Sequence, residues 1–360
     1  MPSPSTQHPM TIRGIGAVSP AGWSAGELVT ATLTNKILAH EELAREGCQH
    51  TCKIRRVPKP QQKLPFARHP RLRRASAISR YVAAAGLEAL GDTRATAVSQ
   101  GELRLGIIVV FATGCVTYTR RFFEEMLEDP ALASPILFPE TVFNAPASHL
   151  SAILGSTGIS YTLLADSAGF LSGLQLARDW LFTDQCDGCL VIGAEEIDWL
   201  ISEAVHLFSR EAILAEGAGA LYLERSESLT SSPIPEVQLS QLTPPLLYTN
   251  QQDKKSAAAK MCSLLEIDPS QEKQCLLVDG LQGVRASDKI EASTWHHWQG
   301  QRLSPRRLVG DALGASVAWQ CINATSLLND SYHDCTSAVV SAIGLNQQSQ
   351  GAIFSPYSLT

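Results

Sequence analysis

The chain has 360 residues, of which 44% are hydrophobic and 18% are charged, and its formal net charge is −6. This apolar content is too high for a disordered chain, and the length suffices for two domains or two fused halves. No apolar run approaches the roughly 18 residues of a membrane span, and residues 1–10 lack the basic and apolar regions of a secretory signal. The composition therefore predicts a cytoplasmic globular protein without a membrane span.

Strands and helices are predicted to alternate through the first two thirds of the chain. The expected strands are residues 10–18, 105–112, 161–164, 189–193 and 217–224. The expected helices are residues 25–35, 78–90, 117–127 and a helix that runs from Asp166 and Ser167 to about residue 182. Residues 48–72 are expected to form a long irregular insertion. The alternation predicts a layered α/β fold.

Residues 226–235 are polar and contain proline, and they mark the best domain boundary. Beyond them the alternation is fainter, with expected strands at 275–279, 337–343 and 352–355 and an expected helix at 307–321. We therefore divide the chain into an N-terminal half, residues 1–230, and a C-terminal half, residues 231–360.

Nine cysteines are scattered, mostly in apolar stretches, as is typical of buried thiols in a reducing compartment. Cys186 and Cys189 have the spacing of half a zinc site or of a redox pair, but Cys189 begins an apolar run that is typical of a buried strand. The nearest other pair, Cys48 and Cys52, is distant in the sequence, and a closed zinc site needs four ligands. We expect structural cysteines and no metal site.

Basic residues are concentrated between residues 47 and 87, which contain ten Lys or Arg and no Asp or Glu. A basic patch on an acidic protein is expected to attract an acidic partner or a phosphate. The segment has no interleaved aromatic residues and no nucleic-acid motif, so we do not expect nucleic acid as the partner. The alternative is a solvated, proline-rich loop.

Several motifs of the first half occur in a recognisable order. They are residues 12–20 (IRGIGAVSP), Arg73 and Arg74 with residues 79–81, residues 138–147 (FPETVFNAPA), residues 185–196 (QCDGCLVIGAEE) and residues 215–224 (AEGAGALYLE). This order resembles the β-ketoacyl-acyl-carrier-protein synthases, the condensing enzymes of the thiolase fold. The resemblance implies a five-layered αβαβα fold built from two similar halves, a dimer, and a C-terminal half that is short for the family.

Active members of that family use a Cys nucleophile at a helix start, and two His residues that stabilise the enolate oxygen formed when malonyl loses carbon dioxide. The resemblance places these positions on Ser167, on Gly280 or Leu281, and on Asp311. A serine hydroxyl is a poor nucleophile without an adjacent base, and a carboxylate at Asp311 would repel an enolate. We therefore expect no catalytic residues and no condensation by this chain alone. Asp166 and Ser167 are instead predicted to form a helix N-cap.

A catalytically degenerate member of this family implies a subunit similar to a chain length factor. Such a subunit pairs with an active β-ketoacyl synthase in a heterodimer and shapes the acyl tunnel, in polyketide, aryl-polyene or fatty-acid-like biosynthesis. The resemblance implies an acyl carrier protein as a second partner. It implies no cofactor of the chain's own, because acyl groups arrive on the phosphopantetheine of the carrier protein.

The resemblance also implies roles for three sets of residues. Tyr118, Phe122 and Phe123 are candidates for the bulky side chains that stop a growing acyl chain, and the alternative is that they are ordinary core aromatics. The strand expected at the dimer seam contains Ser160, Tyr161, Thr162, Leu163 and Leu164. The candidate contacts to the carrier protein are Arg55, Arg56, Arg73 and Arg74.

Two other functions are compatible with the sequence. Residues 165–169 (ADSAG) half match the G-x-S-x-G turn of serine hydrolases, so Ser167 is a candidate nucleophile of an acyl hydrolase or acyltransferase. Its base would come from His149, His206, His296, His297 or His333. The other alternative is a non-catalytic homodimer that binds acyl chains or a carrier protein.

Overall fold

The computed structural model describes residues 9–61, 63–226, 236–268, 270–330 and 335–356, which form one 11-stranded sheet and one three-stranded sheet with helices on their faces. The first half supplies, in spatial order, β1 (Met10–Val18), β8 (Gly217–Arg225), β6 (Gly188–Glu195), β4 (Leu105–Phe111) and β5 (Ser160–Leu164). The second half supplies β9 (Val237–Leu242), β14 (Gln348–Pro356), β13 (Ser337–Ile343), β11 (Cys275–Val278) and β12 (Gln301–Leu303), and β10 (Leu246–Leu247) pairs with β14. The two sets of strands meet where β1 runs antiparallel to β9, with Met10 opposite Leu239.

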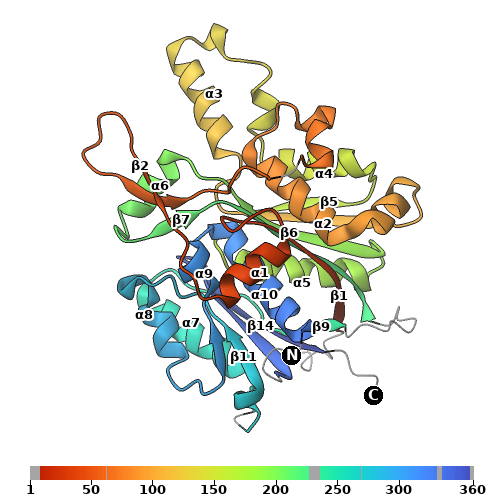
Figure 1. The fold of residues 1–360 in the computed structure, drawn as a ribbon, viewed down its shortest axis with the longest axis vertical. Helices are drawn as coiled ribbons and strands as arrows, with labels where there is room; N and C mark the ends of the chain where they lie inside the picture. Colours follow the sequence, from red (N-terminus) through yellow and green to blue (C-terminus); the bar gives the residue numbers. More distant parts are fainter. Residues whose placement is uncertain (1–8, 62, 227–235, 269, 331–334, 357–360) are drawn as a thin grey trace.

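Helices lie outside and between the two sets of strands (Figure 1). The outer face of the first set is covered by α2 (Ala77–Ser99) and α4 (Ala145–Leu154), and that of the second by α7 (Gln251–Leu264) and α8 (Arg285–Thr294). Between the sets lie α5 (Gly169–Phe182) and α10 (Ser316–Asn329), which contact strands of both halves. The predicted five-layered αβαβα fold is confirmed.

The main core surrounds the two central helices. Phe170 of α5, Trp319 of α10 and Phe354 of β14 are fully buried in one cluster that joins both halves. Removing such an aromatic side chain costs about 3–5 kcal/mol in protein cores. The central layer therefore holds the halves together as one unit.

The predicted helix of small residues after residue 77 packs very closely on the first strand. A Cβ atom at Gly14 would lie 1.9 Å from the carbonyl oxygen of Ala89, and one at Gly16 would lie 2.1 Å from that of Ala85. Only glycine on β1 allows this approach, because any side chain would overlap the backbone of α2.

Two predictions about individual elements are wrong. The helix expected at residues 307–321 is divided into α9 (Pro305–Val309) and α10, because Gly310 has a φ of 99° and interrupts the helical backbone. The insertion at residues 48–72 is not wholly irregular, because β3 (Cys52–Arg55) pairs with β2 (Glu41–Leu43) and with β7 (Ile213–Ala215). Ile54 of β3 and Leu214 of β7 are buried in a small hydrophobic cluster that is separate from the main core.

The remaining helices of eight or more residues are α1 (Ala25–Leu33), α3 (Val116–Glu128) and α6 (Trp199–His206). Helix α3 confirms the helix predicted at residues 117–127 and projects from the body of the molecule (Figure 1). The proposed domain boundary falls largely on residues 227–235, which lie outside the described residues.

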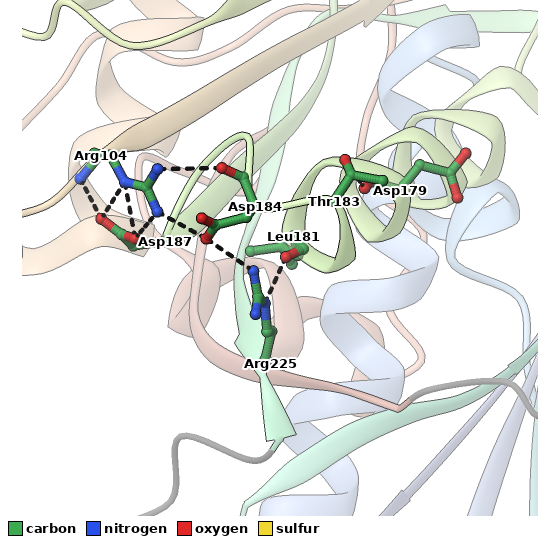
Figure 2. Close-up of polar contacts among 7 residues, drawn as sticks. All are labelled: Arg104, Asp179, Leu181, Thr183, Asp184, Asp187 and Arg225. Carbon is green, nitrogen blue, oxygen red and sulfur yellow. Dashed lines mark hydrogen bonds and ion pairs between the residues drawn. The ribbon is translucent and has the colours of Figure 1, made fainter.

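A network of ion pairs holds the turn between α5 and β6 (Figure 2). The Arg104 guanidinium donates to both Asp184 and Asp187, with Nη2 2.9 Å from Asp184 Oδ1 and 2.6 Å from Asp187 Oδ1. Arg225 Nη2 reaches the same Asp184 oxygen at 3.2 Å. The network fixes the path of the chain as it leaves α5 and enters the central strand β6.

In the part of the chain that the structure describes, no helix is both long and apolar enough to cross a membrane. The same residues include no group of three or more His, Cys, Asp or Glu side chains arranged to hold a metal ion.

Candidate functional site

Ser167 lies in the turn between β5 and α5 and is almost completely buried. The N-cap of α5 is Ala168, and no side chain caps this end, so the predicted capping role of Ser167 is wrong. The adjacent Asp166 accepts a hydrogen bond from the Ala168 N–H at 3.2 Å, which tightens the turn without capping the helix.

Asp166 also fastens a distant loop to this turn. Its Oδ2 accepts hydrogen bonds from the backbone N–H groups of Asn346 at 3.3 Å and Gln347 at 3.0 Å, in the loop between β13 and β14. In return, the Asp166 N–H donates to Gln347 Oε1 at 2.9 Å. Burial raises the pKa of the Asp166 carboxyl, although these N–H groups favour its charged form.

Asp311, at the second expected imidazole position, is a structural bridge. Its carboxylate accepts hydrogen bonds from Ser316 Oγ at 2.7 Å, from the Leu313 N–H at 3.1 Å and from Gln282 Nε2 at 2.8 Å. The bond from Gln282 joins the loop after β11 to the segment between α9 and α10. The oxygens of this carboxylate are therefore occupied by the protein itself.

Gly280 and Leu281, the two residues considered for the first imidazole position, lie in the loop after β11. The Gly280 N–H donates to Glu291 Oε1 at 3.3 Å, and the Leu281 N–H donates to Asp279 Oδ1 at 2.9 Å. Burial, reinforced by the charge of Asp279, raises the pKa of Glu291 to about 7. A carboxyl group that titrates near neutral pH thus lies beside Gly280.

Arg306 of α9 connects these groups. It is only 4% exposed, and its Nη1 lies 3.9 Å from Asp311 Oδ1. Its positive charge also lowers the pKa of Asp166 and of Glu291, against the larger effect of burial. The structure thus places Asp311 and Gly280 beside one buried cation, whose charge also acts on Asp166, the residue before Ser167.

The serine-hydrolase alternative requires a histidine near Ser167. The contacts of the candidate histidines do not involve that serine: His149 pairs with Glu140, His206 stacks on His50, and His296 packs against His297. His333 lies outside the described residues. The described geometry therefore provides no support for an activated Ser167.

The sequence did not lead us to the buried carboxylate of Glu195, which lies at the end of β6. Glu195 of β6 accepts hydrogen bonds from the backbone N–H groups of Ala112 at 2.9 Å, Thr113 at 3.1 Å and Gly314 at 3.3 Å, and from the Thr113 hydroxyl. It is 1% exposed, and burial raises its pKa to about 7. The run of acidic residues after a buried strand was the available signal, because an acid in that place needs buried donors.

The candidate chain-stopping residues are not core aromatics. On α3 only Val116 is buried, Phe123 is 60% exposed, and Tyr118 and Phe122 are half-buried. Phe122 packs on Phe138 with ring centroids 5.6 Å apart. These side chains therefore lie at the surface of this chain and do not line its interior.

The expected seam strand, β5, is the edge strand of the large sheet. It pairs with β4, and its second edge has no partner strand among the described residues. Tyr161 and Leu164 are about half exposed, at 55% and 50%. An edge strand with exposed apolar side chains is a template for association with another chain.

The four arginines considered as carrier-protein contacts differ in their surroundings. The prediction that Arg55 is a surface contact is wrong, because this residue is 3% exposed and its Nε donates to the Leu38 carbonyl at 2.9 Å. Arg56 is half exposed in an ion pair with Glu41 and Glu216. Arg73 and Arg74 are exposed just before α2.

Comparisons with known proteins agree with this architecture. The model of the β-ketoacyl synthase N-terminal domain family matches residues 12–228. The β-ketoacyl-[acyl-carrier-protein] synthase III of Rickettsia rickettsii (strain Sheila Smith) is 38% identical over 93 residues, which is 24% of this chain and 27% of that protein. The chain thus matches only about a quarter to a third of the length of such curated relatives.

Solved structures match over nearly the whole chain. The ishigamide ketosynthase/chain length factor is 16% identical, with a TM-score of 0.76 over 97% of this chain and 100% of that one. A ketosynthase in complex with its chain length factor, from Xenorhabdus doucetiae, is 14% identical, with a TM-score of 0.75 over 99% and 100%. At these identities the likeness establishes the fold. Because the family model covers more than half of the chain, this protein belongs to the β-ketoacyl synthase family.

Proposed function

We propose that this chain is a non-catalytic partner of an active β-ketoacyl synthase, completing a heterodimer and shaping its acyl tunnel as a chain length factor does. The proposal rests above all on the side chains at the three expected catalytic positions. Ser167 has no histidine among its described contacts, Gly280 has no side chain, and the Asp311 carboxylate is bound by the protein's own donors. None of these three positions supplies the thiolate nucleophile or an enolate-binding imidazole that condensation requires.

The surface beside the site supports a protein partner. Helix α3 follows β4, and β4 pairs with the open-edged β5. The exposed apolar side chains of this region, all of them more than a third exposed, are Phe123, Met126, Leu127, Leu132, Ile136, Phe138, Val142, Phe143, Ile159, Tyr161 and Leu164. So many exposed apolar side chains on neighbouring elements are typical of a protein interface.

The carrier protein is the second partner in this proposal. Arg73 and Arg74 are exposed in a segment without acidic residues and would attract the acidic surface of an acyl carrier protein. One solved relative is described as a type II polyketide acyl carrier protein in complex with its ketosynthase. Polyketide, aryl-polyene or related acyl chains are the substrate class that we propose for the pair.

The test is co-expression with an active ketosynthase that has an intact Cys-His-His set, taken from the same genome. Size-exclusion chromatography with light scattering should give a stable one-to-one complex. A chain that remains a homodimer in the presence of that ketosynthase would contradict the heterodimer and support a non-catalytic homodimer instead. Labelling of Ser167 by a serine-reactive probe, lost in Ser167→Ala, would support the hydrolase.

A further inference from the structure

Cys186 and Cys189 are a pair of thiols that the proposed function does not involve. Cys189 lies on the central strand β6, paired with Gly106 of β4, and Cys186 lies in the turn between α5 and β6. A Cβ atom at Gly106 would lie 3.0 Å from Cys186 Sγ and 3.3 Å from Cys189 Sγ. The two sulfurs therefore lie over the same glycine, and a side chain at position 106 would crowd both of them.

The two thiols also interact with each other. A hydrogen bond joins the Cys189 thiol to the Cys186 sulfur and is the largest influence on the pKa of Cys186, which it lowers. The Gly106 N–H donates to the same sulfur, and the charge of Arg104 acts in the same direction, against the effect of burial. Burial holds the pKa of Cys189 well above its ordinary value. Cys186 is therefore the better nucleophile of the pair, because the thiolate is the reactive form.

An attacking thiol followed three residues later by a second thiol is the arrangement of a Cys-x-x-Cys redox pair. We propose that Cys186 and Cys189 form a reversible disulfide by exchange with a small-molecule disulfide such as oxidised glutathione. Neither cysteine belongs to the proposed heterodimer contacts, so this inference does not depend on the proposed function.

The exchange takes place in two steps. The Cys186 thiolate attacks one sulfur of glutathione disulfide, whose S–S bond breaks, and the first glutathione leaves as a thiolate. Cys189 then loses its proton and attacks Cys186 Sγ, which forms the internal disulfide and releases the second glutathione. The two glutathione thiolates take up the two protons that the cysteines lose. Two protein thiols are thus oxidised by two electrons while one glutathione disulfide is reduced to two thiols.

Access to Cys186 depends on the turn that carries it. The residue is 1% exposed, so a reagent reaches its sulfur only when this turn opens. On the outside of the turn, Arg104 pairs with Asp184 and Asp187 (Figure 2). Arg225 also pairs with Asp184, whose side chain is 71% exposed. Exposed ion pairs contribute little to stability, so they resist opening of the turn only weakly.

The test is peptide mapping of the full chain after incubation in glutathione buffers that range from reducing to oxidising. Trypsin cleaves after Arg178 and Arg210, so one peptide contains Cys186 and Cys189 and no other cysteine. Under oxidising conditions this peptide should become lighter by two hydrogen atoms and stop reacting with N-ethylmaleimide. Excess reduced glutathione should restore both thiols. Two free thiols in every buffer, under conditions that oxidise the urea-unfolded chain, would overturn the proposal.

Single substitutions identify the attacking thiol. Cys189→Ser removes the second thiol, so oxidised glutathione should leave a stable mixed disulfide on Cys186. Cys186→Ser should leave Cys189 unmodified, because this residue is fully buried. An adduct on Cys189 in the first case's absence, with none on Cys186 in Cys189→Ser, would overturn the order of attack. If either variant does not fold, the wild-type peptide still decides whether the disulfide forms.

A third variant tests the turn as the cover of Cys186. Asp184→Asn removes the acceptor that Arg104 and Arg225 share, and oxidation should become about two- to fivefold faster. Asp179→Asn on α5 is the matched control and should not change the rate, because this exposed carboxylate has no hydrogen-bond or ion-pair partner among the described residues (Figure 2). Equal rates for Asp184→Asn and the wild type would contradict the role of the turn.

Discussion

Burial raises the pKa of Glu195, and the carboxylate of this residue joins segments that are far apart in the chain. Its carboxylate accepts hydrogen bonds from Ala112 and Thr113 at the end of β4 and from Gly314 before α10. Hydrogen bonds to a charged acceptor each contribute about 1.5–3 kcal/mol to stability. Desolvation nevertheless outweighs them and raises the pKa of Glu195 to about 7.

This balance predicts a pH-dependent stability. The pKa of Glu195 is higher in the folded than in the unfolded chain, so the folded chain holds the proton more tightly. The stabilising contribution is complete below about pH 4.5, the ordinary glutamate value, and is lost as the pH rises through about 7. Urea unfolding should therefore show a free energy of unfolding that decreases between pH 5 and pH 8.

Glu195→Gln should reduce that decrease, because the amide does not ionise. The expected change is on the order of 2–3 kcal/mol in the difference between the two pH values. Glu128→Gln, at an exposed position of α3, is the matched control and should leave the pH dependence unchanged. An identical pH dependence in wild type and Glu195→Gln would show that Glu195 titrates normally.

At the scale of single elements, β5 and α3 have apolar surfaces without a covering layer. The edge of β5 exposes Tyr161 and Leu164, and α3 exposes Phe123 and Leu127. An exposed apolar edge is an aggregation hazard unless another chain covers it. We therefore expect both elements to lie in the interface with the ketosynthase in the proposed heterodimer.

A charge on the β5 edge should weaken the heterodimer. Leu164→Glu places a carboxylate in the proposed interface, where its desolvation costs several kcal/mol, so the dissociation constant should rise at least about tenfold. Leu247→Glu, an equally apolar and more exposed position on β10, is the control and should not affect association. Analytical ultracentrifugation of the mixed subunits measures the dissociation constant of each variant. Equal dissociation constants for Leu164→Glu and Leu247→Glu would show that β5 is not part of the interface.

Truncating the aromatics of α3 should lengthen the product of the reconstituted pair. Phe122→Ala and Phe123→Ala remove bulk that would otherwise stop the growing chain, while the fold should persist because neither side chain is in the core. Mass spectrometry of the released products gives the chain length. Unchanged products after truncation of Tyr118, Phe122 and Phe123 together would exclude α3 from length control.

At the scale of the whole molecule, the layered fold could be predicted because its strands are continuous buried runs. Residues 105–111 and 188–195 are buried throughout, and this is typical of central strands between helices. The prediction of one continuous helix at residues 307–321 was wrong because apolar periodicity continues across Gly310, whose backbone conformation ends α9. Periodicity reports burial, and a backbone break within a buried segment leaves that pattern unchanged.

The internal contacts of the site could not be predicted in the same way. Asp166 is bound to Gln347, and Asp311 to Gln282, so each carboxylate is held by a loop distant in the sequence. Residue identity alone predicted that the catalytic positions differ from those of active family members. It did not indicate that Arg306 would be buried near them with two nitrogens that have no hydrogen-bond partner among the described residues.

The central claim is that any carbon–carbon bond formation takes place in the partner's active site. The direct measurement is elongation of an acyl carrier protein thioester with malonyl-carrier protein, followed by mass spectrometry, for this chain alone, for the ketosynthase alone and for the pair. We predict no elongation by this chain alone, and full-length products only from the pair. A two-carbon extension by this chain purified without its partner would contradict the account.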